Sequence, residues 1–299
     1  MKILVTGAGG FVGKQMISYF VAQGHEVTGV DRNRRPDDGA GGALDWIQAD
    51  TMQKGGWQDA VSASEVVINL AGKNIFGRWS EKTKTDILES RVRTTENVVD
   101  AVSGNKPVIL LSTSAVGYYG NRGDDRLDEG EPAGDDFLAR VCIEWEGQAD
   151  RAAEKGVRVA NMRFGLVMGK NGGALKTMLP AYKAFVGGPL GSGKHFMPWV
   201  HMADLISVHE FVISNDAING PVNCCAPNPV RNEVFSKTLA SVLGRPDFFR
   251  VPRFALRLAM GELGEMMLSS QRAIPEKLLA NGFAFRFPVL KAALEDLLA

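Results

Sequence analysis

The sequence predicts an α/β protein with a Rossmann-like, doubly wound parallel sheet and a smaller C-terminal domain on the substrate side. Two observations carry this prediction. Short β-branched runs alternate with longer helical patterns up to about residue 163, and the first of these runs is followed directly by a glycine-rich turn. Strands that alternate with helices form βαβ units, whose strands pair in parallel.

The individual elements follow from apolar periodicity and from the turn residues between them. Strands are predicted at 2–6, 26–31, 45–49, 65–70, 107–113 and 157–163. Helices between them are predicted at 11–23, 79–103 and 135–155. After residue 163 the alternation stops, and helices are predicted at 174–186, 201–214, 231–243, 253–268, 275–281 and 288–298.

Length and charge limit the classes of partner. A chain of 299 residues with 45% hydrophobic content can bury a substantial core. Lys plus Arg and Asp plus Glu are both 34, so no global field attracts nucleic acid or an anionic membrane. We therefore expect a small-molecule substrate, no nucleic-acid partner and no membrane partner. The oligomeric state is left open.

Cysteine content and apolar runs bear on the compartment. The cysteines are Cys142, Cys224 and Cys225, an odd number without paired spacing, which argues against a disulfide framework and a zinc site. The chain opens on a strand-like run, and no apolar run reaches the roughly 20 residues that span a bilayer. We expect a cytoplasmic protein without a bound metal.

A glycine-rich turn follows the first predicted strand and leads into a helix. Gly7, Gly10 and Gly13 have the spacing of a dinucleotide site. Such a turn lets the backbone approach a pyrophosphate, and it places that anion at the positive end of the helix. The backbone of Phe11 and Val12, which open the helix, is expected to contact the cofactor.

The second predicted strand ends in Asp31 and Arg32, about 20 residues past the turn, where the adenosine ribose is recognised. Asp31 favours ribose hydroxyls and repels a 2′-phosphate, whereas Arg32, Arg34 and Arg35 attract one. The choice between NAD and NADP is therefore open at this point.

Two later strand ends are expected to border the same crevice, because parallel strands bring their carboxyl ends to one edge of a sheet. After the third strand stands Asp50, and after the fourth come Leu70, Ala71 and Gly72. The alternative for these residues is ordinary turn chemistry.

Several segments resemble the extended short-chain dehydrogenase/reductases, in the NAD(P)-dependent epimerase/dehydratase branch. The glycine turn at 6–13, the segment 69–72 and the segment 199–204 carry this likeness. A closer likeness is to an epimerase-family subgroup typified by a human short-chain member and bacterial proteins. It is carried by residues 112–120, 136–146, 187–193, 226–230, 270–272 and 282–285.

The resemblance implies a domain division and a cofactor. It places an NAD(P)-binding domain at 1–165, with 201–225 returning to it, and a C-terminal substrate domain at 166–200 and 226–299. NADP(H) is the favoured cofactor, with NAD(H) possible. Ser112 and Arg163 match superfamily positions near the cofactor, and the segment 199–204, with His201, is expected to anchor the helix that joins the two lobes.

The chain departs from the family at the catalytic dyad. The superfamily uses a Tyr with a Lys four residues later, and no tyrosine here has that partner: Tyr19, Tyr118, Tyr119 and Tyr182. At the expected place stand Phe137 and Val141 or, with a one-residue shift, Leu138 and Cys142. Standard sugar epimerisation is therefore not expected.

Three residues could replace the dyad: Ser114, Tyr118 and Cys142. Ser114 matches the active-site serine of the superfamily, with the neighbouring Ser112 and Thr113 as alternatives in another register. Tyr118 or its neighbour Tyr119 follows on the loop above the sheet. Each has a structural alternative, since a tyrosine can pack under a cap and a buried cysteine often acts as a small hydrophobic residue.

Charged residues near the same place have two readings as well. Arg91 and Arg163 either bind a carboxylate or phosphate in a bidentate manner or form structural salt bridges. Glu144, on the helix that normally carries the dyad, could act in acid–base chemistry, and the alternative for both Glu144 and Glu146 is that they are solvated helix charges.

Taken together, the residues predict an NAD(P)-dependent oxidoreductase or epimerase-like enzyme of atypical mechanism that acts on a small polar substrate. The alternative is a catalytically silent NADPH-binding sensor or regulatory protein, which the missing dyad favours.

Overall fold

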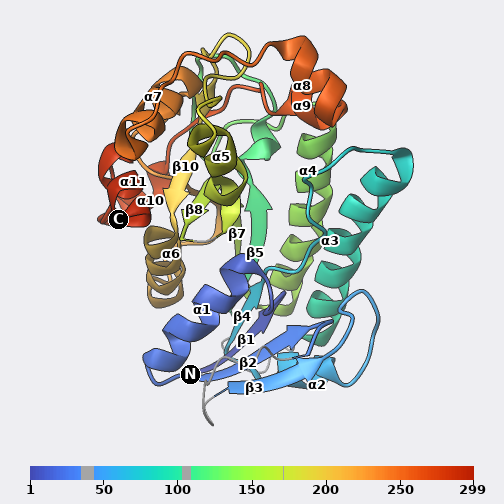
Figure 1. Ribbon diagram of the computed structural model, residues 1–299. Coiled ribbons are helices and arrows are strands. Elements are labelled where there is room, and N and C mark those ends of the chain that lie inside the picture. The colour runs from blue at the N-terminus through green and yellow to red at the C-terminus, as the bar shows by residue number, and fades with distance from the viewer. Residues whose placement is uncertain (35–43, 103–108, 171) are drawn as a thin grey trace.

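The centre of the molecule is a parallel sheet. The structure is a computed structural model that describes residues 1–34, 44–102, 109–170 and 172–299. Within these ranges the main sheet has seven strands in the order β3-β2-β1-β4-β5-β7-β11, every pair parallel (Figure 1). The strands are β1 (Lys2–Thr6), β2 (Glu26–Asp31), β3 (Leu44–Gln48), β4 (Val66–Asn69), β5 (Ile109–Ala115), β7 (Arg158–Phe164) and β11 (Gly220–Cys224).

The predicted fold class is confirmed, and the strand order places the site. Chain order reverses between β1 and β4, so the two halves of the sheet wind away from this point. In open α/β sheets a ligand binds outside the carboxyl ends of the strands at such a reversal. The six predicted strands are all present near their expected bounds. Residues 107–108 of one predicted strand and residue 103 at the end of a predicted helix lie outside the described residues.

Strand β11 was not predicted, and its composition explains why. Its five residues include Gly220, Pro221 and Asn223, which are types depleted in strands. Among the described strands it pairs only with β7, so it lies at the edge of the sheet, where a proline is tolerated. Pairing with a distant strand therefore outweighs local preference.

Helices cover both faces of the sheet (Figure 1). On one face α1 (Phe11–Ala22) packs with α6 (Met202–Ser214) over a core that includes Met16, Phe20 and Leu205. On the other lie α2 (Trp57–Ala63), α3 (Glu81–Ala101) and α4 (Phe137–Asp150), over a core that includes Val67 and Val98.

The side chains of β5 alternate between the two faces of the sheet, and this alternation determines on which face its polar residues lie. Leu111 belongs to the core under α1 and α6, whereas Leu110 belongs to the core under α2 and α3. Successive side chains of a strand point to opposite faces, so Ser112 and Ser114 lie on the same face as Leu110. Both serines therefore face the α3–α4 layer.

The second half builds a further core at the upper end of the molecule in Figure 1. It includes Trp199, Phe235 and Leu294. The helices here are α5 (Gly173–Lys183), α7 (Asn232–Leu243), α8 (Arg253–Met260), α9 (Glu262–Met266), α10 (Glu276–Ala280) and α11 (Leu290–Leu298). The predicted helix over 253–268 is two helices, because Gly261 between them has φ +64°, a left-handed conformation.

Short strand pairs connect this half to the sheet region. The parallel pairs are β8 (Leu166–Gly169) with β10 (Trp199–His201), and β6 (Arg126–Leu127) with β13 (Arg272–Ala273), and the antiparallel pair is β9 (Phe196–Met197) with β12 (Val230–Arg231). Short 3₁₀ helices η1 (Val116–Tyr119) and η2 (Arg151–Lys155) follow β5 and α4.

The segment around His201 ties α6 to the end of the chain. His201 caps the helix by accepting the Ala203 N–H at Nδ1 over 3.0 Å. The carboxylate of Asp204 accepts the backbone N–H groups of Arg286 and Phe287 over 2.7 and 3.0 Å. These contacts hold α6 to the C-terminal segment, in keeping with the anchoring role expected for residues 199–204. In the parts of the chain that the structure describes, no helix combines the length and the apolar character needed to cross a membrane.

Candidate cofactor and active site

Two positions of the glycine turn after β1 strongly favour glycine. Gly7 has φ +64°, and a Cβ there would lie 3.0 Å from the backbone nitrogen of Ala71. A Cβ at Gly13 would lie 2.3 Å from the Gly7 carbonyl oxygen. Gly7 therefore allows the close approach of the turn to the β4 end, and Gly13 allows α1 to pack on the turn.

The start of α1 is open for an anion. Gly10 is the N-cap residue, no side chain caps the helix, and its first turn contains no acidic residue. The first N–H groups of a helix lack partners within it and carry partial positive charge. This is the arrangement that binds a phosphate group, so the turn fits the pyrophosphate of a dinucleotide.

Phe11 and Val12 contribute packing as well as backbone. A Cβ at Gly172 would lie 2.1 Å from Cδ2 of Phe11, so the glycine segment after β8 lies directly on that ring. Val12 packs against the core under α1 and α6. Because their side chains pack within the protein, Phe11 and Val12 would contact the cofactor through their backbone. This contact stays a prediction.

The end of β2 holds Asp31 against the glycine turn. Its Oδ2 accepts the Gly9 N–H over 3.0 Å, and its Oδ1 accepts the Asn33 N–H over 2.9 Å. Arg32 and Arg34 beside it are exposed, and Arg35 lies outside the described residues. Both carboxylate oxygens of Asp31 thus already accept hydrogen bonds from the protein, whereas Arg32 and Arg34 lie at the surface.

The end of β4 is locked to β1 beside the turn. The Thr6 hydroxyl donates to Asn69 Oδ1 over 2.7 Å and accepts the N–H groups of Leu70 and Ala71 over 3.1 and 3.2 Å. This arrangement brings the Leu70–Gly72 segment next to Gly7, as expected for two strand ends that share one crevice.

Asp50 is exposed after the edge strand β3, and its Oδ1 accepts the Met52 N–H over 3.1 Å. That hydrogen bond links residues two apart and is typical of a turn. Its predicted contact with the cofactor stays a prediction.

A buried polar network lies at the carboxyl ends of β5 and β7. Arg163 on β7 donates from Nε and Nη2 to the two carboxylate oxygens of Glu146 on α4, each over 2.8 Å. Ser114 on β5 donates to Glu146 Oε1 over 2.6 Å. Arg163 Nη1 donates to the Tyr119 hydroxyl over 2.9 Å, and that hydroxyl donates to Asn223 Oδ1 over 2.8 Å.

The charges of this network balance within it. Burial by itself lowers the pKa of Arg163, but the hydrogen bonds and charge of Glu146 outweigh it and raise that pKa. Burial also raises the pKa of Tyr119, so its phenol stays protonated. Ser114 is 1% exposed and Arg163 is 3% exposed. Of the two roles considered for Arg163, ligand binding and a structural salt bridge, the structure shows the salt bridge.

Cys142 and Ser112 are also buried. The Cys142 thiol lies 3.7 Å from the Ala115 carbonyl oxygen, and burial, together with the charge of Glu146, raises its pKa to about 11. It stays a protonated thiol at neutral pH, which is the form without nucleophilic character. Ser112 is fully buried, and its hydroxyl has no hydrogen-bond partner among the described residues.

Tyr118 differs from the other candidates. It is half-buried, and the guanidinium carbon of Arg163 lies 3.5 Å from its ring centroid. Its ring meets that of Tyr119 edge to face, with centroids 5.4 Å apart. Its hydroxyl forms no hydrogen bond with any described residue, so among the three candidates it alone has an uncommitted proton.

The roles of two network residues, Glu146 and Asn223, were not predicted from the sequence pattern. Glu146 was read as a possible solvated charge, which suits the exposed Glu144 but not Glu146, which is 7% exposed. Its position four residues after the buried Cys142 was the available signal, because residues i and i+4 share a helix face. Asn223 carried no signal, since it lies on the unpredicted β11.

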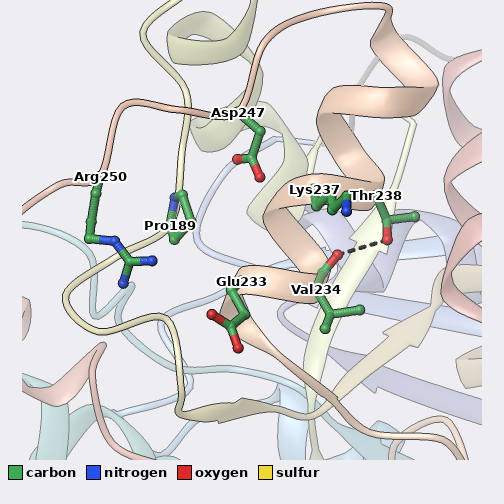
Figure 2. A pocket seen from close by; sticks show the side chains of 7 residues that line it. All are labelled: Pro189, Glu233, Val234, Lys237, Thr238, Asp247 and Arg250. Atoms are coloured by element: carbon green, nitrogen blue, oxygen red, sulfur yellow. Dashed lines mark hydrogen bonds between the residues drawn. The ribbon is translucent and has the colours of Figure 1, made fainter.

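A polar pocket of about 600 Å³ lies elsewhere, along α7 (Figure 2). It is lined by Pro189, Glu233, Val234, Lys237, Thr238, Asp247 and Arg250. None of these is a predicted site residue, and basic and acidic groups both face the space. The described residues contain no group of three or more His, Cys, Asp or Glu placed to hold a metal ion.

Comparisons with known proteins agree with this geometry. A model of the NAD dependent epimerase/dehydratase family matches residues 3–225, and a domain of unknown function, DUF1731, matches residues 251–297. A crystal structure of the human epimerase family protein SDR39U1 (isoform2) with NADPH has a TM-score of 0.86 at 31% identity, covering 99% of each chain.

Sequence relatives extend over the whole chain. The chloroplastic SDR39U1 homolog of Arabidopsis thaliana, an epimerase family protein, is 39% identical, covering 100% of this chain and 87% of the relative. The epimerase family protein YfhF of Bacillus subtilis is 36% identical, covering 100% of this chain and 98% of the relative. The resemblance inferred from the motifs is confirmed: this chain belongs to the NAD-dependent epimerase/dehydratase family, in the group that also carries the DUF1731 domain.

Proposed function

We propose that the protein is an NADP(H)-dependent oxidoreductase or epimerase-like enzyme of atypical mechanism, acting on a small polar substrate. The observation that carries this proposal is the glycine cradle at the switch point of the sheet, where a Cβ at Gly7 or Gly13 would fill the space. The human relative whose structure contains NADPH supports the choice of cofactor.

NADP(H) is favoured over NAD(H) by the groups at the end of β2. Arg32 and Arg34 are exposed there and can pair with a 2′-phosphate. Both oxygens of Asp31 already accept N–H groups of the protein, so part of their capacity for ribose hydroxyls is used. NAD(H) remains the second possibility for this site.

A bound nicotinamide supplies hydride chemistry, and the chain must then handle the proton. Tyr118 is the candidate donor, because its hydroxyl has no hydrogen-bond partner in the part of the chain that the structure describes, whereas those of Ser114 and Tyr119 are bonded to buried groups. Arg163 contacts the Tyr118 ring, and Glu146 accepts a hydrogen bond from Ser114, so this ion pair positions both residues. Cys142 fills space beside them as a neutral thiol.

Calorimetric titration with NADPH, NADP, NADH and NAD tests the cofactor assignment. We expect NADPH to bind most tightly and Arg32→Ala to weaken NADPH by roughly tenfold, the effect of about 1.4 kcal/mol, while NADH binding changes little. Asp31→Ala is the companion variant, and it should weaken NADH more than NADPH. Equal affinity for NADPH and NADH in wild type and Arg32→Ala would contradict the phosphate reading.

The second candidate is a catalytically silent NADPH-binding sensor. The observation that favours it is that Val141 and Cys142, the two residues offered at the place of the family's Lys, are both buried, and the Cys142 thiol is neutral. A screen of small carbonyl compounds for NADPH oxidation separates the two candidates. Turnover that Tyr118→Phe abolishes supports the enzyme, and NADPH-dependent protection of the C-terminal half from proteolysis without any turnover supports the sensor.

The expected cytoplasmic location belongs to this proposal as well. The three cysteines are all free thiols, which suits a reducing compartment. A small molecule is the proposed partner, and nucleic acid is not.

A further inference from the structure

We propose that Arg91 is an anion-binding residue of the reaction site, and that its ligand is a carboxylate or phosphate group of either the substrate or the cofactor. This inference rests on the proposed function, since it adds a ligand class to the same site. The sequence leaves ligand binding and a salt bridge open for this arginine, and we choose ligand binding.

Arg91 lies between the β4 end and α4. It projects from α3, and its guanidinium carbon lies 5.0 Å from the ring centroid of Trp145 on α4. A Cβ at Gly72 would lie 3.3 Å from Cγ and from Cζ of Arg91. The side chain therefore runs along the Leu70–Gly72 segment, which adjoins the glycine turn.

The hydrogen bonds of Arg91 leave part of its guanidinium unused. Nη1 donates to the Ile87 carbonyl oxygen over 2.9 Å and to that of Lys73 over 3.1 Å. Nε and Nη2 have no acceptor among the described residues. Arg163 is the contrast, since its Nε, Nη1 and Nη2 all have partners.

No carboxylate in the described part of the chain forms an ion pair with Arg91. Two acidic residues lie within the five positions before Arg91 on the same helix. Asp86 pairs with the Lys73 ammonium over 2.6 Å, and Glu89 pairs with Arg93 over 3.1 Å. Glu146 on the facing helix is held by Arg163 and Ser114. These carboxylates are therefore already paired with other groups.

The charge of Arg91 is also poorly solvated. Burial lowers its pKa to about 10, and the neighbouring Cys142 sulfur acts in the opposite direction to a smaller extent. Cys142 cannot balance the charge, because burial keeps its thiol protonated at neutral pH. A partly buried cation without a counter-ion is costly, and an incoming anion offsets that cost.

The guanidinium group selects the kind of anion. Its planar fork of N–H donors matches the two oxygens of a carboxylate or phosphate. Nε and Nη2, the unused pair, lie on one edge of that fork, as two-point binding requires. The ligand we expect is therefore an oxyanion with two adjacent oxygens.

The test is calorimetric titration of wild type, Arg91→Gln and Arg91→Lys. Each protein is titrated with NADPH, and then with oxalate and inorganic phosphate, both free and saturated with NADPH. Arg93→Gln is the matched control, because Arg93 lies on the same helix, is exposed and pairs with Glu89. Arg91→Lys keeps the charge and loses the fork, so it remains informative if Arg91→Gln does not fold.

The outcomes separate the two sources of the anion. If the anion is on the substrate, NADPH affinity is unchanged and oxalate or phosphate binding weakens at least tenfold in Arg91→Gln and less in Arg91→Lys. If the anion is on the cofactor, NADPH binding itself weakens tenfold in Arg91→Gln, and Arg93→Gln behaves as wild type in both cases. The inference is overturned if wild type binds neither anion and NADPH binds the variants normally, or if both variants match wild type throughout.

Failure of the proposed function gives a different result. Wild type would then bind no nucleotide, while the anion titrations of the free protein would still report on Arg91.

Discussion

Arg163 and Glu146 form a two-point ion pair, with Nε and Nη2 of Arg163 each 2.8 Å from a different carboxylate oxygen of Glu146. The pair joins β7 to α4, and Ser114 adds β5 through the same carboxylate. The carboxyl end of β7 is therefore fixed to α4 by a charge pair, and that of β5 by a hydrogen bond to the same carboxylate. The Arg163 guanidinium also lies over the Tyr118 ring, so the pair contacts both Ser114 and Tyr118.

Removing the carboxylate charge should destabilise the fold. Glu146→Gln leaves the Arg163 cation buried without its counter-ion, and breaking a buried pair in this way costs about 3 kcal/mol. Urea denaturation measures the change in the free energy of unfolding. Glu144→Gln is the control, since Glu144 is exposed on the same helix and should change stability by less than about 0.5 kcal/mol. Equal decreases in the free energy of unfolding of the two variants would show that the buried ion pair contributes no more to stability than an exposed carboxylate.

The three cysteines should be unreactive in the native protein. All are buried, and burial raises the pKa of Cys142 to about 11 and raises those of Cys224 and Cys225 as well. Few thiolates are then present at pH 8, and thiolate is the reactive form. A thiol reagent such as DTNB should modify all three in denaturant and none quickly without it. Rapid labelling of Cys142 alone would point instead to an accessible reactive thiol.

The pH dependence of stability should include a contribution from His209. Burial lowers its pKa to about 4, below the unperturbed value of about 6.5, so the unfolded state binds its proton more readily. Stability is therefore greatest above pH 6.5 and is lost as pH falls toward 4. Between pH 7.5 and 5.0 this group alone accounts for about 2 kcal/mol.

A variant isolates that contribution. His209→Asn has no titrating group at this position, while every other titrating group is common to both proteins. The difference between wild type and variant should shrink as pH falls from 7.5 to 5.0, in urea denaturation at each pH. A difference that is constant with pH would show that His209 does not titrate as its burial predicts.

Much of the fold could be predicted because its signals are local. The strands β1, β2 and β4 are short apolar runs, and the glycine turn follows β1 at once. By contrast, β11 forms from residues such as Gly220 and Pro221 because β7 offers it a partner from a distant part of the chain. That kind of pairing is invisible to local periodicity.

The same distinction applies to the site. The glycine positions were predicted because one turn imposes them, and each has the close contacts that the role requires. The Glu146–Arg163 pair depends on which face of α4 meets β7, and the contact of Tyr119 with Asn223 depends on where β11 lies. Residues from distant strands meet only in the folded sheet, so this part could not be predicted from spacing.

The turn after β1 is expected to bind the pyrophosphate of NADPH, and a matched pair of glycine variants tests this role. In Gly13→Ala the added methyl would lie 2.3 Å from the Gly7 carbonyl oxygen, so the turn must shift. Gly147→Ala places the same methyl on α4 with no atom within 4 Å, and it should be neutral or stabilising by up to about 1 kcal/mol.

The measurement is the quenching of intrinsic fluorescence on titration with NADPH, with circular dichroism to confirm that each variant is folded. We predict that wild type and Gly147→Ala bind NADPH alike and that a folded Gly13→Ala binds at least tenfold more weakly. Unchanged NADPH affinity in a folded Gly13→Ala, or no binding by wild type, would contradict the account.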